Sequence, residues 1–64
     1  MSYADALQRA RRLAERRRQA VYVVLADAYW HEYETATEEQ LETYFAGSHP
    51  LAYVDPEGVT TPCH

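Results

Sequence analysis

The sequence contains one cysteine, two glycines and no lysine, and it has no arginine beyond residue 18. A lone cysteine excludes an internal disulfide, whereas small secreted domains usually carry several, so we expect a reducing cytoplasm. No apolar run approaches the roughly 18 residues that cross a membrane. The first arginines are followed by no apolar block like that of a signal peptide, so we expect neither a membrane span nor export.

Motifs for catalysis and metal binding are also missing. The soft metal ligands are His31, His49, Cys63 and His64. Their spacing fits no zinc pattern, Cys63 has no neighbouring base, and there is no glycine-rich phosphate loop. Glu32 and Glu34 lie close in sequence, but an acid–base pair needs a cleft that excludes water, for which so small a domain has little room. We therefore expect no enzyme activity, no metal and no cofactor.

What the chain does have is a sharp division of charge. The net charge is −4, yet the first 20 residues hold all six arginines against two carboxylates. Residues 21–64 hold the other eight carboxylates and no lysine or arginine. Such an asymmetry bears on the partners of a protein rather than on its fold.

The first segment, residues 3–19, predicts an arginine-rich helix. Ser2 is a suitable N-cap, and alanine and leucine recur at helical spacing in a narrow apolar stripe. The stripe consists of Ala6, Leu7, Ala10, Leu13 and Ala14. The pairs Asp5–Arg9 and Arg11–Glu15 are spaced to interact along the helix. We expect the arginines to face solvent and neutralise the acidic remainder, which would repel a phosphate backbone, rather than to bind nucleic acid.

Residues 20–35 predict a strand pair joined by a hairpin connection, because two β-rich runs lie close together there. A two-residue turn would set glutamates opposite valines, and burying unpaired carboxylates is strongly unfavourable. A loop over residues 27–29, or a longer loop of the same parity, avoids this. The shorter loop pairs Leu25 with His31 and Val23 with Tyr33, which makes His31 a half-buried sheet residue.

In this register the odd-numbered residues face the core. The opposite face carries Tyr22, Val24, Trp30, Glu32 and Glu34. Two interpretations of that face stay open. In the first it lies beneath the arginine-rich helix, whose side chains meet the glutamates at the rim. In the second it is an exposed partner site, since exposed aromatics among polar residues mark interfaces.

The remainder predicts a second helix and a closing hairpin. Thr37 and Gln40 form a capping box for an acidic helix over 38–46, with Leu41, Tyr44 and Phe45 as its apolar face and Gly47 as its stop. Leu51–Val54 is a third strand, 55–58 a tight turn with Pro56 in its second position, and 59–61 a candidate edge strand. Cys63 and His64 are expected to be loose.

The predicted order is therefore helix, strand, strand, helix, strand, with an optional further strand at the end. This order is typical of a single α+β domain over residues 1–64, in which the helices pack on an antiparallel sheet of three to four strands. The closing strand or hairpin spans residues 51–61. We expect the chain to be a monomer.

The acidic residues and the aromatics among them form the candidate partner-binding surface. Its residues are Tyr22, Asp27, Trp30, Glu32, Glu34, Glu38, Glu39 and Glu42. Spaced carboxylates can imitate phosphates and compete with nucleic acid for a Lys/Arg-rich groove on another protein. Trp30 would supply the part of the affinity that does not depend on salt.

In its length, in the acidic stretch VLADAYWHEYETATEEQLETYFAG and in a helix on a small sheet, the chain resembles the anti-CRISPR proteins of phages and mobile elements, most closely inhibitors of type I systems. The resemblance covers the whole chain in character only, and it carries no diagnostic motif or residue role. It implies a non-enzymatic inhibitor in the bacterial cytoplasm. The implied partner is the DNA-surveillance complex, with the large subunit that reads the motif beside the target site as its candidate contact.

The six arginines depart from a pure DNA mimic and leave room for a mixed-charge interface. Two alternatives stay open. One is a small nucleic-acid-binding regulator that uses the arginine-rich helix. The other is an accessory domain of a phage particle or of a toxin–antitoxin pair.

Overall fold

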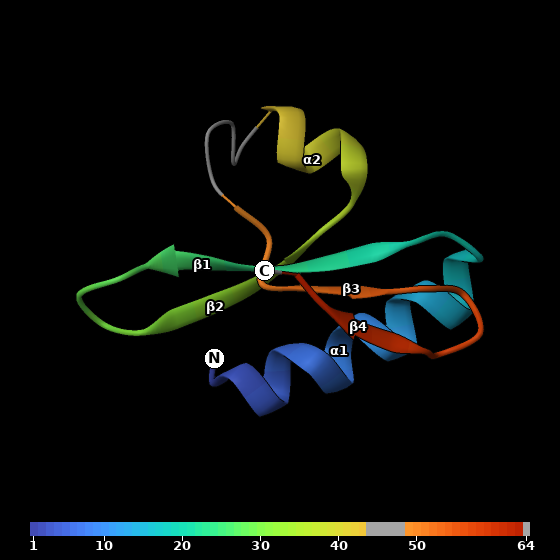
Figure 1. The fold of residues 1–64 in the computed structure, drawn as a ribbon, viewed down its shortest axis with the longest axis horizontal. Coiled ribbons are helices and arrows are strands. Elements are labelled where there is room, and N and C mark those ends of the chain that lie inside the picture. Colours follow the sequence, from blue (N-terminus) through green and yellow to red (C-terminus); the bar gives the residue numbers. More distant parts are fainter. Residues whose placement is uncertain (44–48, 64) are drawn as a thin grey trace.

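In the computed structural model, which describes residues 1–43 and 49–63, two helices lie on opposite sides of a four-stranded antiparallel sheet (Figure 1). The elements are α1 (Tyr3–Arg17), β1 (Val21–Asp27), β2 (Glu32–Ala36), α2 (Glu38–Thr43), β3 (Ala52–Val54) and β4 (Thr60–Pro62). The strand order is β2-β1-β3-β4, so β2 and β4 form the two edges. The predicted α+β class is confirmed, together with the candidate fourth strand.

Helix α1 begins where its predicted N-cap places it and ends at Arg17, two residues before the predicted end at residue 19. The Asp5 N–H donates to the Ser2 hydroxyl at 3.2 Å, which satisfies one of the N–H groups left open at a helix start. At the other end Arg18 has a φ of 53°, and its N–H donates to the carbonyl of Ala14. This left-handed residue turns the chain out of the helix and into β1.

The core lies between α1 and one face of the sheet. Ala6, Ala10 and Ala14 are fully buried against a set of small sheet residues. Those residues are Val21, Val23, Ala52 and Val54. Because the helix contributes only methyl groups at these positions, its backbone can lie close to the sheet, and the largest fully buried side chains are valines. The predicted apolar stripe is therefore the packing face of α1.

Over residues 22–25 the β1–β2 register keeps the predicted parity but not the predicted pairs. An irregularity between Leu25 and Asp27 then shifts the register by one residue, so that Asp27 lies opposite Glu32. Leu25 lies opposite Tyr33 and Val23 opposite Thr35, two residues further along than the three-residue loop requires. The longer loop exists because the Asp27 Oδ1 accepts the N–H groups of Tyr29 at 2.9 Å and of Trp30 at 3.2 Å. The expectation of a half-buried His31 was wrong, because His31 lies in this connection, exposed, with a φ of 52°.

Helix α2 begins with the predicted capping box. The Thr37 N–H donates to the Gln40 Oε1 at 3.0 Å, and the Gln40 N–H donates to the Thr37 Oγ1 at 3.2 Å. The predicted continuation to residue 46, with Tyr44 and Phe45 on its apolar face and a stop at Gly47, lies outside the described residues. On the sheet face opposite α1, Val24 and Ala36 are buried.

The β3–β4 hairpin closes through a turn at Asp55. The Gly58 N–H donates to the Asp55 carbonyl at 2.9 Å, with Pro56 in the second position as predicted and Gly58 at a φ of 87°. Beyond the hairpin, the Cys63 N–H donates to the Leu51 carbonyl at 2.9 Å. The expectation that Cys63 is loose was therefore wrong for its backbone; His64 lies outside the described residues.

Candidate functional site

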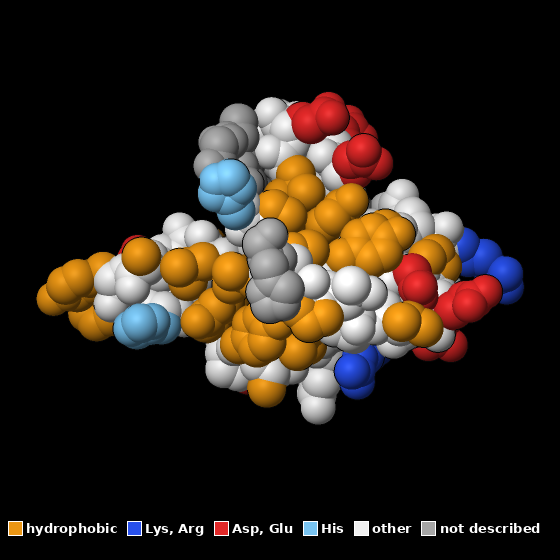
Figure 2. All heavy atoms as spheres, in the orientation of Figure 1, with side chains coloured by type: hydrophobic (Ala, Val, Ile, Leu, Met, Phe, Trp, Pro, Cys, Tyr) orange, Lys and Arg blue, Asp and Glu red, His pale blue; other side chains and the backbone are white. Residues whose placement is uncertain are grey.

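The sheet face opposite α1 carries part of the predicted surface. Cross-strand pairing sets Tyr22 beside Tyr53 on this face and Val24 beside Glu34. The Tyr22 and Tyr53 rings meet edge to face with centroids 5.3 Å apart, and burial raises the pKa of the Tyr22 phenol above 10.0. In Figure 2 hydrophobic side chains fill the region between α2 and the sheet, with carboxylates above them on α2 and at the right-hand end. The predicted acidic sheet face is thus largely apolar.

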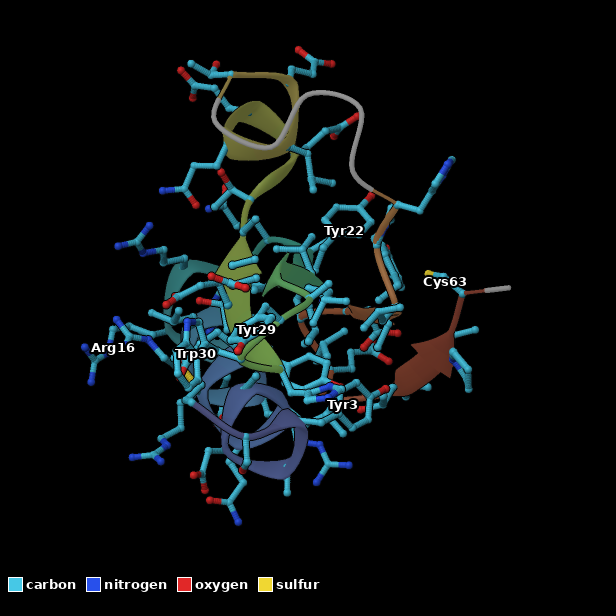
Figure 3. The ribbon with its side chains drawn as sticks, turned by 90° about the vertical axis from the view of Figure 1, so that its left-hand side faces the viewer. Tyr3, Arg16, Tyr22, Tyr29, Trp30 and Cys63 are labelled. Carbon is cyan, nitrogen blue, oxygen red and sulfur yellow. The ribbon has the colours of Figure 1, made fainter. Side chains whose placement is uncertain are left out.

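Trp30 lies away from that face, contrary to the predicted register. It belongs to the β1–β2 connection and is 70% exposed, next to Tyr29 at 80%. The two rings meet edge to face with centroids 4.9 Å apart, and Figure 3 shows them side by side at this end of the molecule. We call Tyr29 and Trp30 the aromatic tip. Asp27, predicted as a partner contact, instead holds the backbone of the tip in place.

Glu32 holds the start of the chain against the sheet. Its carboxylate pairs with the Met1 ammonium group, and this contact raises the pKa of that ammonium above 8.0. The Met1 carbonyl accepts the Tyr33 N–H at 3.1 Å, and the Tyr3 and Tyr33 rings pack edge to face nearby. Glu32 therefore has a partner within the molecule, and it lies apart from the acidic residues of α2.

The acidic residues that the structure does bring together are those of α2. Glu38, Glu39 and Glu42 are all exposed, and the last turn of the helix carries no basic residue. We call these three the acidic helix patch. They line an open cleft of about 710 Å³ that they share with Arg17, the last residue of α1, and with Gln19 in the connection to β1. Among residues 1–43 and 49–63, however, no ion pair joins an arginine to any of them.

The arginines of α1 do not neutralise the acidic residues by direct contact. The five arginines of α1 are all exposed, as is Arg18 directly after the helix, and the predicted pairs Asp5–Arg9 and Arg11–Glu15 are not formed. The Arg11 Nε donates instead to the Thr60 hydroxyl on β4 at 3.3 Å. Arg9, Arg12 and Arg16, whose helical spacing places them away from the apolar stripe, line one hollow beside α1. We call these three the basic stripe.

The eight predicted site residues therefore fall into separate places. The hairpin with the aromatic tip extends at one end of the molecule, whereas α2 lies above the middle of the sheet (Figure 1). Glu34 is half-buried on β2, and Tyr22 lies in the aromatic pair on the sheet. A partner that contacts both the acidic helix patch and the aromatic tip must therefore span two surfaces.

Comparisons with known proteins find no family for this chain. No protein-family model, no curated protein and no solved structure matches the chain. Within the described ranges, no group of three His, Cys, Asp or Glu side chains is arranged to hold a metal ion. The helices of this described part are also too short or too polar to cross a membrane.

Proposed function

We propose that the protein is a non-enzymatic inhibitor that binds a basic, nucleic-acid-binding surface of a bacterial defence complex in the cytoplasm. The observation that carries this proposal is the acidic helix patch. Three exposed carboxylates lie on one short helix, and none of them is paired with an arginine in the described part of the chain. Their field is therefore available to an outside cation.

The patch suits fast encounter with a Lys/Arg-rich groove. Uncompensated carboxylates raise the association rate with a cationic surface and make it fall as salt increases. Glu38 and Glu42 are four residues apart, so they project from the same side of α2 about 6 Å apart along its axis. The capping box fixes the first turn, which limits the ordering that binding would require.

The aromatic tip would add affinity that salt does not remove. Tyr and Trp are enriched among the residues that dominate binding energy, and this pair is exposed on a turn that Asp27 holds. Because the tip and the patch lie on different parts of the surface, the partner that suits both is large or concave. In its specific form, which rests on the resemblance to anti-CRISPR proteins, the proposal names the large subunit of a type I surveillance complex.

The test measures target-duplex binding by a purified type I surveillance complex in the presence of this protein. The wild type is expected to block DNA binding. Glu39→Lys/Glu42→Lys is expected to lose at least about tenfold in inhibitory potency, because two attractive contacts become repulsive. The matched control is Glu15→Lys/Glu57→Lys, which makes the same change in net charge at exposed sites outside α2 and is expected to keep near wild-type potency. Equal loss in both variants, or no inhibition by the wild type, would contradict the proposal.

A second candidate function rests on the basic stripe of α1. Arg9, Arg12 and Arg16 are exposed and unpaired within the described residues, so they could contact phosphates of a nucleic acid directly. A mobility shift with random duplex DNA at low salt separates the two functions. A clear shift that Arg12→Glu/Arg16→Glu abolishes supports a nucleic-acid-binding regulator. The absence of a shift, together with release of DNA from the surveillance complex, supports the inhibitor.

A further inference from the structure

The outer edge of β2 has backbone groups available for another strand. The Val23 carbonyl accepts the Leu51 N–H at 2.7 Å, so Val23 directs its backbone groups toward β3. Thr35 lies opposite Val23. Because Val23 bonds to β3, the two residues form a non-hydrogen-bonded pair, in which the N–H and carbonyl of each residue point away from the other strand. Outside the β1–β2 ladder, no backbone or side-chain hydrogen bond recorded within residues 1–43 and 49–63 involves the N–H or carbonyl of Thr35.

The chain itself shows that this edge accepts a further segment. Tyr33 precedes Thr35 by two residues, so its N–H points to the same side, and it donates to the Met1 carbonyl at 3.1 Å. The Met1 segment therefore occupies one end of the edge. Beyond the Met1 segment, this edge still presents the Tyr33 carbonyl and the N–H and carbonyl of Thr35.

A groove of about 410 Å³ runs between this edge and α1. Arg9, Leu13 and Arg17 line it from the helix side, at positions four residues apart and hence on one stripe. Glu34 and Gln40 line the other side. Figure 1 shows α1 running alongside the strands, and Figure 3 places Arg16 on the side of the molecule away from Cys63.

We propose that this edge binds an extended segment of a partner protein by strand addition, and that the segment has the pattern acidic–polar–apolar–polar–acidic. Arg9 and Arg17 are eight helical residues apart, which is about 12 Å along the axis. Residues i and i+4 of a strand are about 13 Å apart and point to one face. Two acidic side chains at this spacing meet the two arginines, and the apolar residue between them meets Leu13. The intervening polar residues face Glu34 and Gln40.

A second copy of this chain fits the edge less well. Pairing β2 with β2 about a two-fold axis would bring two α1 helices side by side on the same sheet face. Arg9 and Arg17 of one copy would then face the same residues of the other copy. Like charges at an exposed strand edge oppose such pairing. A nucleic acid lacks the peptide groups that would complete the ladder at Thr35. The proposal does not depend on the acidic helix patch.

The test is an NMR titration of the full chain with a peptide that contains Glu-Thr-Val-Thr-Glu. A peptide of the same composition with the order Glu-Glu-Val-Thr-Thr is the control ligand. The expected result is a set of shifts centred on β2, slower hydrogen exchange at the Thr35 amide, and about tenfold weaker binding of the control peptide. No shift on β2, or equal binding of the two peptides, would overturn the proposal.

Two variants separate the backbone and charge contributions. Thr35→Pro removes the outward N–H without breaking a ladder bond and is expected to abolish the peptide shifts. Arg9→Glu/Arg17→Glu is expected to weaken binding at least about tenfold, whereas Arg11→Glu/Arg12→Glu, with the same charge change outside the groove, keeps most of it. Equal effects of the two charge variants, or occupation of the edge by a second copy in sedimentation analysis, would contradict the assignment.

Discussion

At the scale of single residues, the side chains near the hairpin divide between holding the structure and facing outward. Asp27 and Glu32 both have partners within the molecule, one in the turn backbone and one at the Met1 ammonium. Tyr29 and Trp30, between them in sequence, keep most of their surface in contact with solvent. Asp27 therefore positions the aromatic pair, and Glu32 holds the start of the chain against the sheet.

This division predicts the behaviour of Trp30→Ala. Because Trp30 is 70% exposed, its removal is expected to change the free energy of unfolding by no more than about 0.5 kcal/mol. It is expected to weaken partner binding, since the indole is the larger ring of the aromatic tip. Thermal melts and binding are compared with those of Val59→Ala, another exposed apolar residue, on the β3–β4 connection. A marked fall in melting temperature, or unchanged partner binding, would show that Trp30 does not have this role.

At the scale of elements, residues with a local signal were predictable. Ser2 and the Thr37–Gln40 pair marked helix starts correctly, and Pro56 marked the closing turn, because each acts through bonds a few residues away. The length of the β1–β2 connection was not predictable from parity, since two loops of the same parity place the same residues on the core face. The choice between them depends on the hydrogen bonds of Asp27, and it moved Trp30 off the sheet.

The packing of α1 gives a prediction at this scale. Ala10 is fully buried where the helix lies on the sheet, so Ala10→Leu must push the two layers apart. Such overpacking is expected to reduce the free energy of unfolding by about 1–3 kcal/mol and the melting temperature by roughly 4 °C or more. Ala4→Leu, an exposed position on the same helix, is the matched control for thermal melts followed by circular dichroism. If both variants melt alike, α1 does not pack closely at Ala10.

At the scale of the whole molecule, the sheet lies between the helix that carries most of the arginines and the helix that carries the acidic helix patch. Figure 3 shows α1 on one side of the sheet and α2 on the other. Charges further apart than about 10 Å are largely screened at moderate salt. Arg17 shares a cleft with the patch but forms no ion pair with it. A partner approaching α2 therefore meets a negative surface even though the chain carries six arginines.

The decisive experiment is a competition between the protein and target duplex for one surveillance complex, followed across a series of salt concentrations. Because the acidic helix patch would occupy the groove that binds DNA, we expect mutually exclusive binding, an association rate that falls steeply as salt increases, and loss of that dependence in Glu39→Lys/Glu42→Lys. Simultaneous binding of duplex and protein, or an association rate that salt and the double substitution leave unchanged, would show that the patch does not act in this way.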